Sequence, residues 1–193
     1  MCNFFSAIIL ESGPALFSWD SDFHETIKEE NKLEDNKLPP DFVPVELTPP
    51  NGNYGETDLS KWIFKTDLDS IPDWYDPKKA RKKAEEALAV FIKERFLINL
   101  ELDEVKDRNL KAIVNCKINK LINCNVGVMR ESSNVGEMRG SSKVGEMWES
   151  SNVGVMRELS NVKKLADGAT CHKLENGEWV VYTPAKTVNV SSC

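Results

Sequence analysis

A tandem repeat of nine residues constrains the fold of this chain more than any other feature of its sequence. Its clearest copies read NVGVMRESS, NVGEMRGSS, KVGEMWESS and NVGVMRELS, and together they span residues 125–160. Four of the chain's five methionines fall at one position of this repeat. Because each unit of a repeat protein packs on its neighbours, such an array indicates one continuous stack.

Weaker copies extend the array in both directions, and they preserve its pair of apolar residues. The pairs are Leu110/Ile113 and Ile118/Leu121 upstream, at a spacing of eight, and Val162/Leu165 and Cys171/Leu174 downstream. The array therefore spans residues 109–177.

Within a unit, small or apolar residues recur at every third position, as at Val126, Met129 and Ser132. This period matches neither an amphipathic helix nor a half-buried strand, and a glycine in every full copy disfavours a helix. We predict a short β-solenoid with two units per turn, one unit per turn being the alternative, and about four turns. Val and Met would stack on their equivalents, and glycine and the serine pairs would form corners. A disordered tract is disfavoured because its apolar residues would not stay in phase.

Residues 1–108 lack the repeat and predict an α+β head module. The expected elements are strands at 3–10, 15–19, 42–47 and 62–66, a helix from Ser21 or Asp22 to about Leu33, and a helix from Asp76-Pro77 to about Leu97. Pro44 predicts an edge position for the strand at 42–47. Asn176-Gly177 predicts a hairpin, so residues 178–193 would form a β cap over the end of the solenoid.

Charge and hydropathy exclude some classes of function. The chain carries 25 basic and 31 acidic side chains, a net charge of −6, so binding to nucleic acid is not expected. Residues 1–77 hold 16 of the acidic side chains and only five basic ones, whereas residues 78–120 are basic. These segments would face each other, or the acidic one would face a basic partner. The short apolar run at 4–10 resembles neither a secretory signal nor a membrane span, so we expect a cytoplasmic protein that does not associate with membranes.

The cysteines fit the repeat better than they fit a metal site. Cys116 and Cys124 occupy the serine position of the upstream units, and Cys171 replaces the repeat valine. Free cysteine behaves as a small buried apolar residue. No metal site and no cofactor are expected.

The N-terminus supplies the sharpest catalytic hypothesis. Removal of Met1 would leave Cys2 with a free α-amine, as in N-terminal-nucleophile enzymes. His24 would then act as the general base, oriented by Asp20 or Asp22. The alternative is that Cys2 lies on an edge strand and His24 lies on a helix surface.

Two sets of side chains are candidate ligand contacts. Trp62 and Trp74 would either line a pocket in the head or pack against its sheet. Four residues share one outward position of the repeat and would form a ladder for an extended or anionic partner, unless neighbouring glutamates neutralise it; these are Arg130, Arg139, Trp148 and Arg157.

The opening Met1-Cys-Asn-Phe-Phe-Ser-Ala-Ile-Ile9, the Asp-x-x-His motif around Asp20 to His24, and the repeat x-Val-x-x-Met-x-x-Ser-Ser together carry a resemblance. The chain resembles uncharacterised phage and mobile-element proteins in which a Met-Cys-Asn-Phe module precedes short solenoid repeats. This resemblance implies a biological setting and no particular chemistry.

Three hypotheses of function follow from the sequence. The first is a non-enzymatic phage or mobile-element protein that sequesters or blocks a host protein or small molecule, with defence components among the candidates. The second is a hydrolase or transferase that depends on Cys2. The third is a structural homo-oligomer assembled through the ends of the solenoid.

Overall fold

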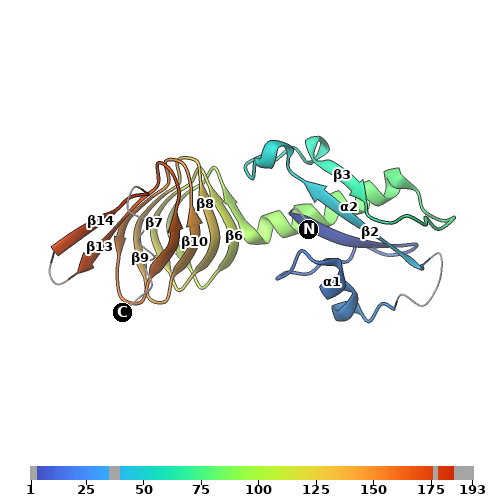
Figure 1. The fold of residues 1–193 in the computed structure, drawn as a ribbon, viewed down its shortest axis with the longest axis horizontal. Coiled ribbons are helices and arrows are strands. Elements are labelled where there is room, and N and C mark those ends of the chain that lie inside the picture. The colour runs from blue at the N-terminus through green and yellow to red at the C-terminus, as the bar shows by residue number, and fades with distance from the viewer. Residues whose placement is uncertain (1–3, 35–39, 176–177, 185–193) are drawn as a thin grey trace. The chain divides into compact units, whose positions relative to one another are not determined.

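A computed structural model describes residues 4–34, 40–175 and 178–184, and it divides into two compact units, Met1–Lys93 and Glu94–Cys193. The first is a small α+β head and the second is a β-solenoid, which confirms the predicted fold class (Figure 1). The boundary lies after Lys93 and not after residue 108. The reason is that strands within residues 96–106 already pair into the solenoid sheets.

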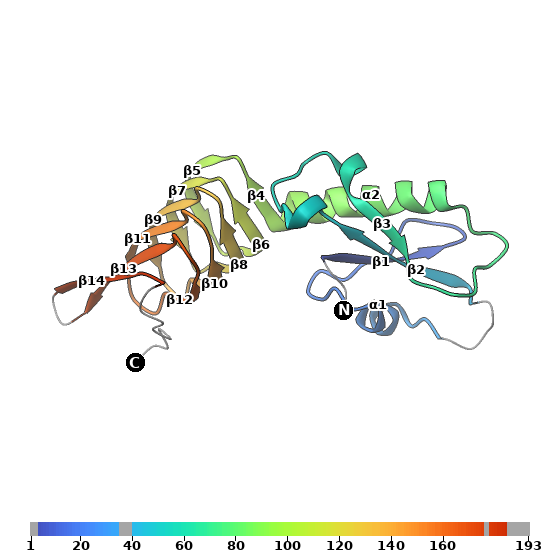
Figure 2. The ribbon, with the colours of Figure 1, turned by 45° about the horizontal axis from the view of Figure 1, so that its top comes forward.

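The head is an antiparallel sheet in the order β1-β2-β3, with one helix on each face (Figure 2). Its elements are β1 (Phe5–Leu10), α1 (His24–Asn31), β2 (Phe42–Thr48), two short 3-10 turns (Pro50–Gly52 and Leu59–Lys61), β3 (Ile63–Thr66) and α2 (Pro77–Arg95).

The two faces of this sheet have different partners because side chains alternate along a strand. Ile8 and Phe42 lie on one face and form an apolar cluster with Ile27 of α1. On the other face Phe5 packs against Phe91 of α2, with ring centroids 5.3 Å apart. The face next to α1 carries the polar groups discussed below.

The start of α2 is confirmed in detail. The carboxylate of Asp76 accepts hydrogen bonds from the backbone N–H groups of Lys78 and Lys79 at 2.9 and 3.2 Å, which is N-cap geometry, and Pro77 is the first helical residue. The helix ends at Arg95 instead of Leu97 because Phe96 and Leu97 belong to a solenoid strand.

Two local predictions in the head were wrong. Residues 15–19 form no full strand; Leu16 makes a single bridge to Ile8. Neither Ser21 nor Asp22 caps α1, whose N-cap position is Phe23. The hydroxyl of Ser21 instead accepts from the N–H of Phe23 and so forms a turn just before the helix.

The prediction that Pro44 marks an edge strand was also wrong, since β2 is the central strand. Ile8, which faces Pro44, exchanges both its backbone hydrogen bonds with Leu16, so this position of the β1–β2 ladder needs no N–H from proline. On its other side Pro44 lies just beyond β3, where its carbonyl accepts from the N–H of Asp67 at 2.9 Å. The N–H group that proline lacks would therefore lie at the end of the β2–β3 ladder, where no strand residue needs it.

The solenoid consists of two parallel sheets that the chain visits in alternation, which confirms two units per turn. The first solenoid sheet contains β4 (Phe96–Ile98), β6 (Asn109–Val114), β8 (Asn125–Arg130), β10 (Lys143–Met147) and β12 (Asn161–Leu165). The second contains β5 (Glu101–Lys106), β7 (Lys117–Ile122), β9 (Asn134–Arg139), β11 (Asn152–Met156) and β13 (Thr170–Glu175), followed by β14 (Glu178–Tyr182). The described residues thus make five turns, one more than expected, because the solenoid begins at β4.

Equivalent residues of successive turns stack in register, as the repeat predicts. Val126 pairs with Val144 and Met129 with Met147 in the first solenoid sheet, and the second repeats this pattern. These side chains are fully buried and form one continuous apolar core.

The corners depend on residues with left-handed backbone conformation. Positive φ angles occur at Asn99, Asp107, Asn115, Asn123, Glu131, Gly140, Glu149 and Glu158. In the eight-residue units these are Asn or Asp, which tolerate this conformation best after glycine. In the nine-residue units an extra residue follows, so the second serine of each pair points inward.

Because of this extra residue, the buried serine of each pair is the second one, and not the first as the predicted three-residue period implies. Ser133 and Ser142 are buried, whereas Ser132 and Ser141 are exposed. The hydroxyl of Ser133 donates to the carbonyl of Arg130 at 2.7 Å. Each buried serine therefore satisfies a backbone carbonyl at its corner.

The repeat glycines lie in the middle of strands and not at corners, contrary to the prediction. A Cβ at Gly145 would lie 2.5 Å from the carbonyl oxygen of Gly127, and one at Gly127 would lie 2.6 Å from that of Lys111. Glycine is therefore required by the close approach of neighbouring turns.

At the C-terminal end, β14 pairs antiparallel with β13. It covers the outer hydrogen-bonding edge of that strand, as expected for part of a cap. The predicted hairpin residues Asn176-Gly177, like residues 185–193, lie outside the described residues.

Candidate functional site

The head contains a cluster of three side chains that we call the His24 cluster: His24, Glu46 and Asp67. They come from the first residue of α1, from β2 and from the residue after β3. One ligand atom of each lies within 4.8 Å of the others. The cluster therefore brings together groups that are far apart in sequence.

The imidazole of His24 is buried and held in one orientation. Its Nε2 lies 3.1 Å from the carbonyl oxygen of Val45. Because a carbonyl only accepts, Nε2 carries the proton and donates this hydrogen bond. In the neutral imidazole, Nδ1 then presents a lone pair toward Asp67, whose Oδ2 lies 3.8 Å away.

The two carboxylates of the cluster differ in exposure. Glu46 is only 8% exposed although it bears a charged group. The carboxylate of Asp67 is 46% exposed and lies 3.3 Å from Nζ of Lys65. The cluster is therefore buried at Glu46 and open to solvent at Asp67, and one nitrogen and two carboxylates form a donor set that could hold a metal ion.

The sequence predicted only one member of this cluster. His24 was singled out, but as a base oriented by Asp20 or Asp22; among the described residues Asp67, and neither of these two, lies within ion-pair distance of it. Cys2, the proposed nucleophile, lies outside the described residues. The one signal for Glu46 is a charged residue inside the apolar run at 42–47, and nothing local marks Asp67.

The two tryptophans predicted as pocket residues lie in different environments. Trp62 is 1% exposed, packs edge-to-face on Phe4 and donates through Nε1 to the carbonyl of Glu56. It is thus a packing residue. Trp74 is half-buried and lines a small cavity of about 60 Å³ with Lys79 and Lys83.

The predicted ladder on the solenoid is split between its two sheets. Since successive units alternate between sheets, Arg130 and Trp148 lie beside the first solenoid sheet, and Arg139 and Arg157 lie beside the second. Equivalent positions nine residues apart therefore never neighbour each other, whereas those 18 apart do.

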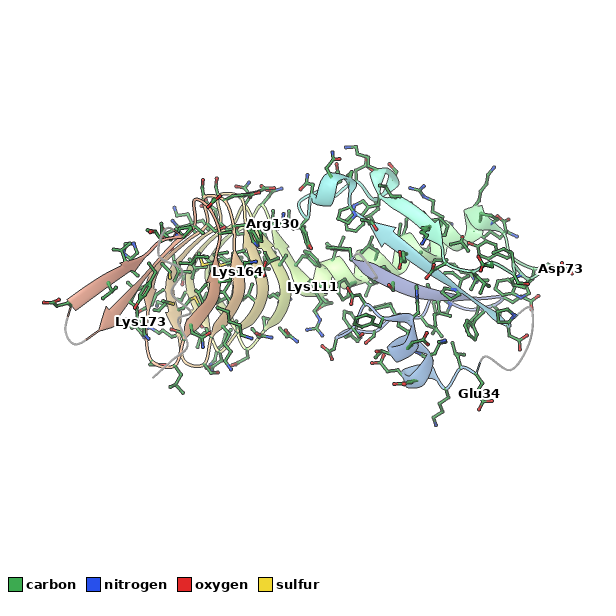
Figure 3. All side chains as sticks on the ribbon, viewed as in Figure 1. Glu34, Asp73, Lys111, Arg130, Lys164 and Lys173 are labelled. Carbon is green, nitrogen blue, oxygen red and sulfur yellow. The ribbon has the colours of Figure 1, made fainter. Side chains whose placement is uncertain are left out.

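Beside the first solenoid sheet, Trp148 lies between two cations (Figure 3 labels Arg130 and Lys164). The guanidinium of Arg130 is 5.6 Å, and Nζ of Lys164 is 4.9 Å, from the indole ring centroid. The indole N–H donates to Glu146 at 2.8 Å. That hydrogen bond, with a smaller effect of Lys164, holds the pKa of the Glu146 carboxyl below its ordinary value. We call these four residues the Trp148 cluster.

Beside the second solenoid sheet, Glu137 binds both arginines. Nε of Arg139 lies 2.7 Å from its carboxylate, and Arg157 binds the other oxygen. The hydrogen bond from Arg139, followed by that from Arg157, lowers the pKa of the Glu137 carboxyl. Glu137 therefore offsets one of the two positive charges of the arginine ladder on this side.

Across the described residues, no helix combines the length and the apolar character needed to cross a membrane. Comparisons of the chain with protein-family models, with curated proteins and with solved structures found no match.

Proposed function

We propose that this protein is a non-enzymatic binding protein of a phage or mobile element, and that it sequesters or blocks a host molecule through the outer surface of its solenoid. The observation that carries the proposal is the Trp148 cluster. The setting is supported by the resemblance of the Met-Cys-Asn-Phe motif and the repeat to such proteins.

The interior of the solenoid argues for a scaffold. Valines and methionines of successive turns fill it, and the serines at its corners are satisfied by backbone carbonyls. Stacked turns of this kind hold outward side chains at fixed spacing. A rigid surface loses little entropy on binding, which favours recognition.

The Trp148 cluster has the composition of a recognition site. Tryptophan and arginine are the residues that contribute most to protein interfaces. Here the indole is fixed by its hydrogen bond to Glu146, and its flanking cations are fixed by stacking. Aromatic, cationic and anionic groups lie together, so a protein partner with a mixed polar surface suits it better than nucleic acid.

The experiment uses a variant that the repeat itself recommends. Arginine occupies the position of Trp148 in three other units, so we expect Trp148→Arg to keep the fold while it removes the indole. Affinity-tagged wild-type protein and this variant are expressed in the same cells, and co-purifying molecules are quantified by mass spectrometry. Lys163→Ala is the matched control, because Lys163 is an exposed residue next to Lys164 in β12.

We expect one molecule to co-purify stoichiometrically with wild type and with Lys163→Ala, and at least about tenfold less with Trp148→Arg, a loss typical of a central interface residue. Equal recovery with all three proteins would show that the bound molecule does not contact the indole of Trp148. Recovery of no stoichiometric molecule would contradict the proposal.

A further inference from the structure

We propose that the head binds one divalent transition-metal ion through Nδ1 of His24 and the carboxylates of Glu46 and Asp67. This site is separate from the Trp148 cluster and does not depend on the binding function proposed above. Four kinds of observation carry it: ligand spacing, the orientation of the imidazole, a buried hydroxyl without a partner, and charge.

The spacing of the donor atoms fits ligands around a common ion. Nδ1 of His24 and Oδ2 of Asp67 are 3.8 Å apart, which is too far for a hydrogen bond. Two ligands each about 2.1 Å from one metal lie roughly 3 to 4 Å apart. The three donors, all within 4.8 Å of one another, need only small side-chain adjustments to reach that range.

The imidazole already has the arrangement of a metal ligand. A metal-binding histidine nearly always donates its other ring N–H to a carboxylate, a backbone carbonyl or water. The contact of Nε2 with the carbonyl of Val45 is such a bond, and it leaves the Nδ1 lone pair free for an ion.

One polar side chain beside Glu46 lacks the partner that burial demands. Glu46 is more than nine-tenths buried, and its carboxylate makes no hydrogen bond or ion pair among the described residues, but its oxygens keep some contact with solvent. Ser6 lies directly opposite Glu46 in the β1–β2 ladder, and its buried hydroxyl has no partner in that part of the chain either. Opposite residues of a ladder share one face of the sheet, so both groups lie on the side of α1.

A buried polar group without a partner costs free energy. The charge of the cluster indicates that a cation is the missing partner. With a neutral imidazole the two carboxylates carry two negative charges, and among the ion pairs of the described residues only the one from Lys65, beside Asp67, offsets one of them. A divalent cation would supply the missing positive charge at Glu46.

The donor set indicates the class of ion. One imidazole nitrogen and two carboxylates suit zinc, manganese and iron(II), whereas calcium and magnesium prefer oxygen ligands alone. Three protein ligands leave coordination positions open, and the exposure of Asp67 places them toward solvent. The bound ion would therefore be accessible to a small anionic or polar ligand.

The test exploits the presence of only two histidines in the chain. Protein without a histidine tag is freed of metal with a chelator and titrated with Zn²⁺, while the ring C–H signals of His24 and His172 are followed by NMR. We expect His24 to shift, with saturation at one equivalent, and the half-buried His172 in β13 to stay unchanged. A His24 ring that does not respond to Zn²⁺ would show a simple ion pair with Asp67 and would overturn the proposal.

Variants then assign the carboxylates. Glu46→Gln and Asp67→Asn should each weaken Zn²⁺ binding at least about tenfold by calorimetry. Asp69→Asn, an exposed carboxylate two residues further along, is the matched control and should leave the affinity unchanged. Equal weakening by all three would indicate nonspecific attraction. If Glu46→Gln does not fold, the wild-type NMR result and Asp67→Asn still decide the question.

Discussion

Single residues in this protein are explained mostly by the positions they occupy in the repeat. Cys116 and Cys124 stand where later turns have a buried serine, and Cys171 pairs with Val153 in the second solenoid sheet. All three thiols are free and buried, and burial raises the pKa of each. They fill the core as small side chains, as the sequence predicts, and the thiols of Cys116 and Cys124 also donate to the backbone carbonyls of Val114 and Ile122.

Cys171 gives a pH-dependent prediction. Burial raises the pKa of its thiol to about 11, whereas in the unfolded chain the thiol ionises near about 8.5. Because the folded-state pKa is raised, its contribution to stability is complete below about pH 8.5 and is lost as the pH rises toward about 11. Cys171→Val, which restores the repeat residue, should therefore show a smaller fall in Tm between about pH 8 and about pH 10 than wild type.

Thermal denaturation at the two pH values measures this difference. Ser150→Ala, an exposed corner substitution, is the control and should behave like wild type. An identical fall in Tm for Cys171→Val and wild type would show that the thiol does not ionise on unfolding in this range.

The His24 cluster shows what sequence cannot supply at this scale. Consecutive members lie 22 and 21 residues apart along the chain, and they meet only because α1 packs on the sheet while Asp67 follows its third strand. The cap of α2 by Asp76, by contrast, depends on residues two and three positions away and was predictable. Local chemistry can be read from sequence, whereas a site assembled by packing cannot.

Among the secondary-structure elements, the parallel strands of the solenoid were predicted because their determinant repeats. The period of nine, with Val and Met in phase, indicates both the stacking and the two sheets. What the pattern concealed was the first turn, whose strands β4 and β5 carry few of the repeat's residues. Their signal is the corner residue, Asn or Asp at every eighth position from Asn99 to Asn123.

The mid-strand glycines give a prediction for the spacing of neighbouring turns. In Gly145→Ala the new methyl group would lie 2.5 Å from the carbonyl oxygen of Gly127, so the backbone must move. We expect a loss of about 1 to 3 kcal/mol in the free energy of unfolding, the usual cost of overpacking. Urea denaturation followed by circular dichroism measures it.

The last turn provides the control. Lys163 occupies the equivalent position in β12, between residues paired with Val144 and Glu146, and it already carries a side chain. Lys163→Ala should therefore be nearly neutral. If Gly145→Ala were as stable as Lys163→Ala, close approach would not be the reason for glycine in the repeat.

The whole molecule combines two units of different character. The solenoid has a filled interior and keeps its polar chemistry on outward side chains, whereas the head gathers polar groups on the face of its sheet next to α1. This division follows from how each forms its core. Repeated turns vary their surface only through single outward residues such as Trp148, whereas the head joins segments that differ in sequence.

Native mass spectrometry of freshly purified protein, followed by weighing the same sample after denaturation, tests the proposed binding function most directly. We predict a complex heavier than the 21.8 kDa chain by the mass of one bound molecule, and a denatured chain without a covalent adduct. Multiples of the chain mass alone would instead indicate a homo-oligomer. A covalent adduct on Cys2 after denaturation would contradict the account and establish the Cys2-dependent enzyme in its place.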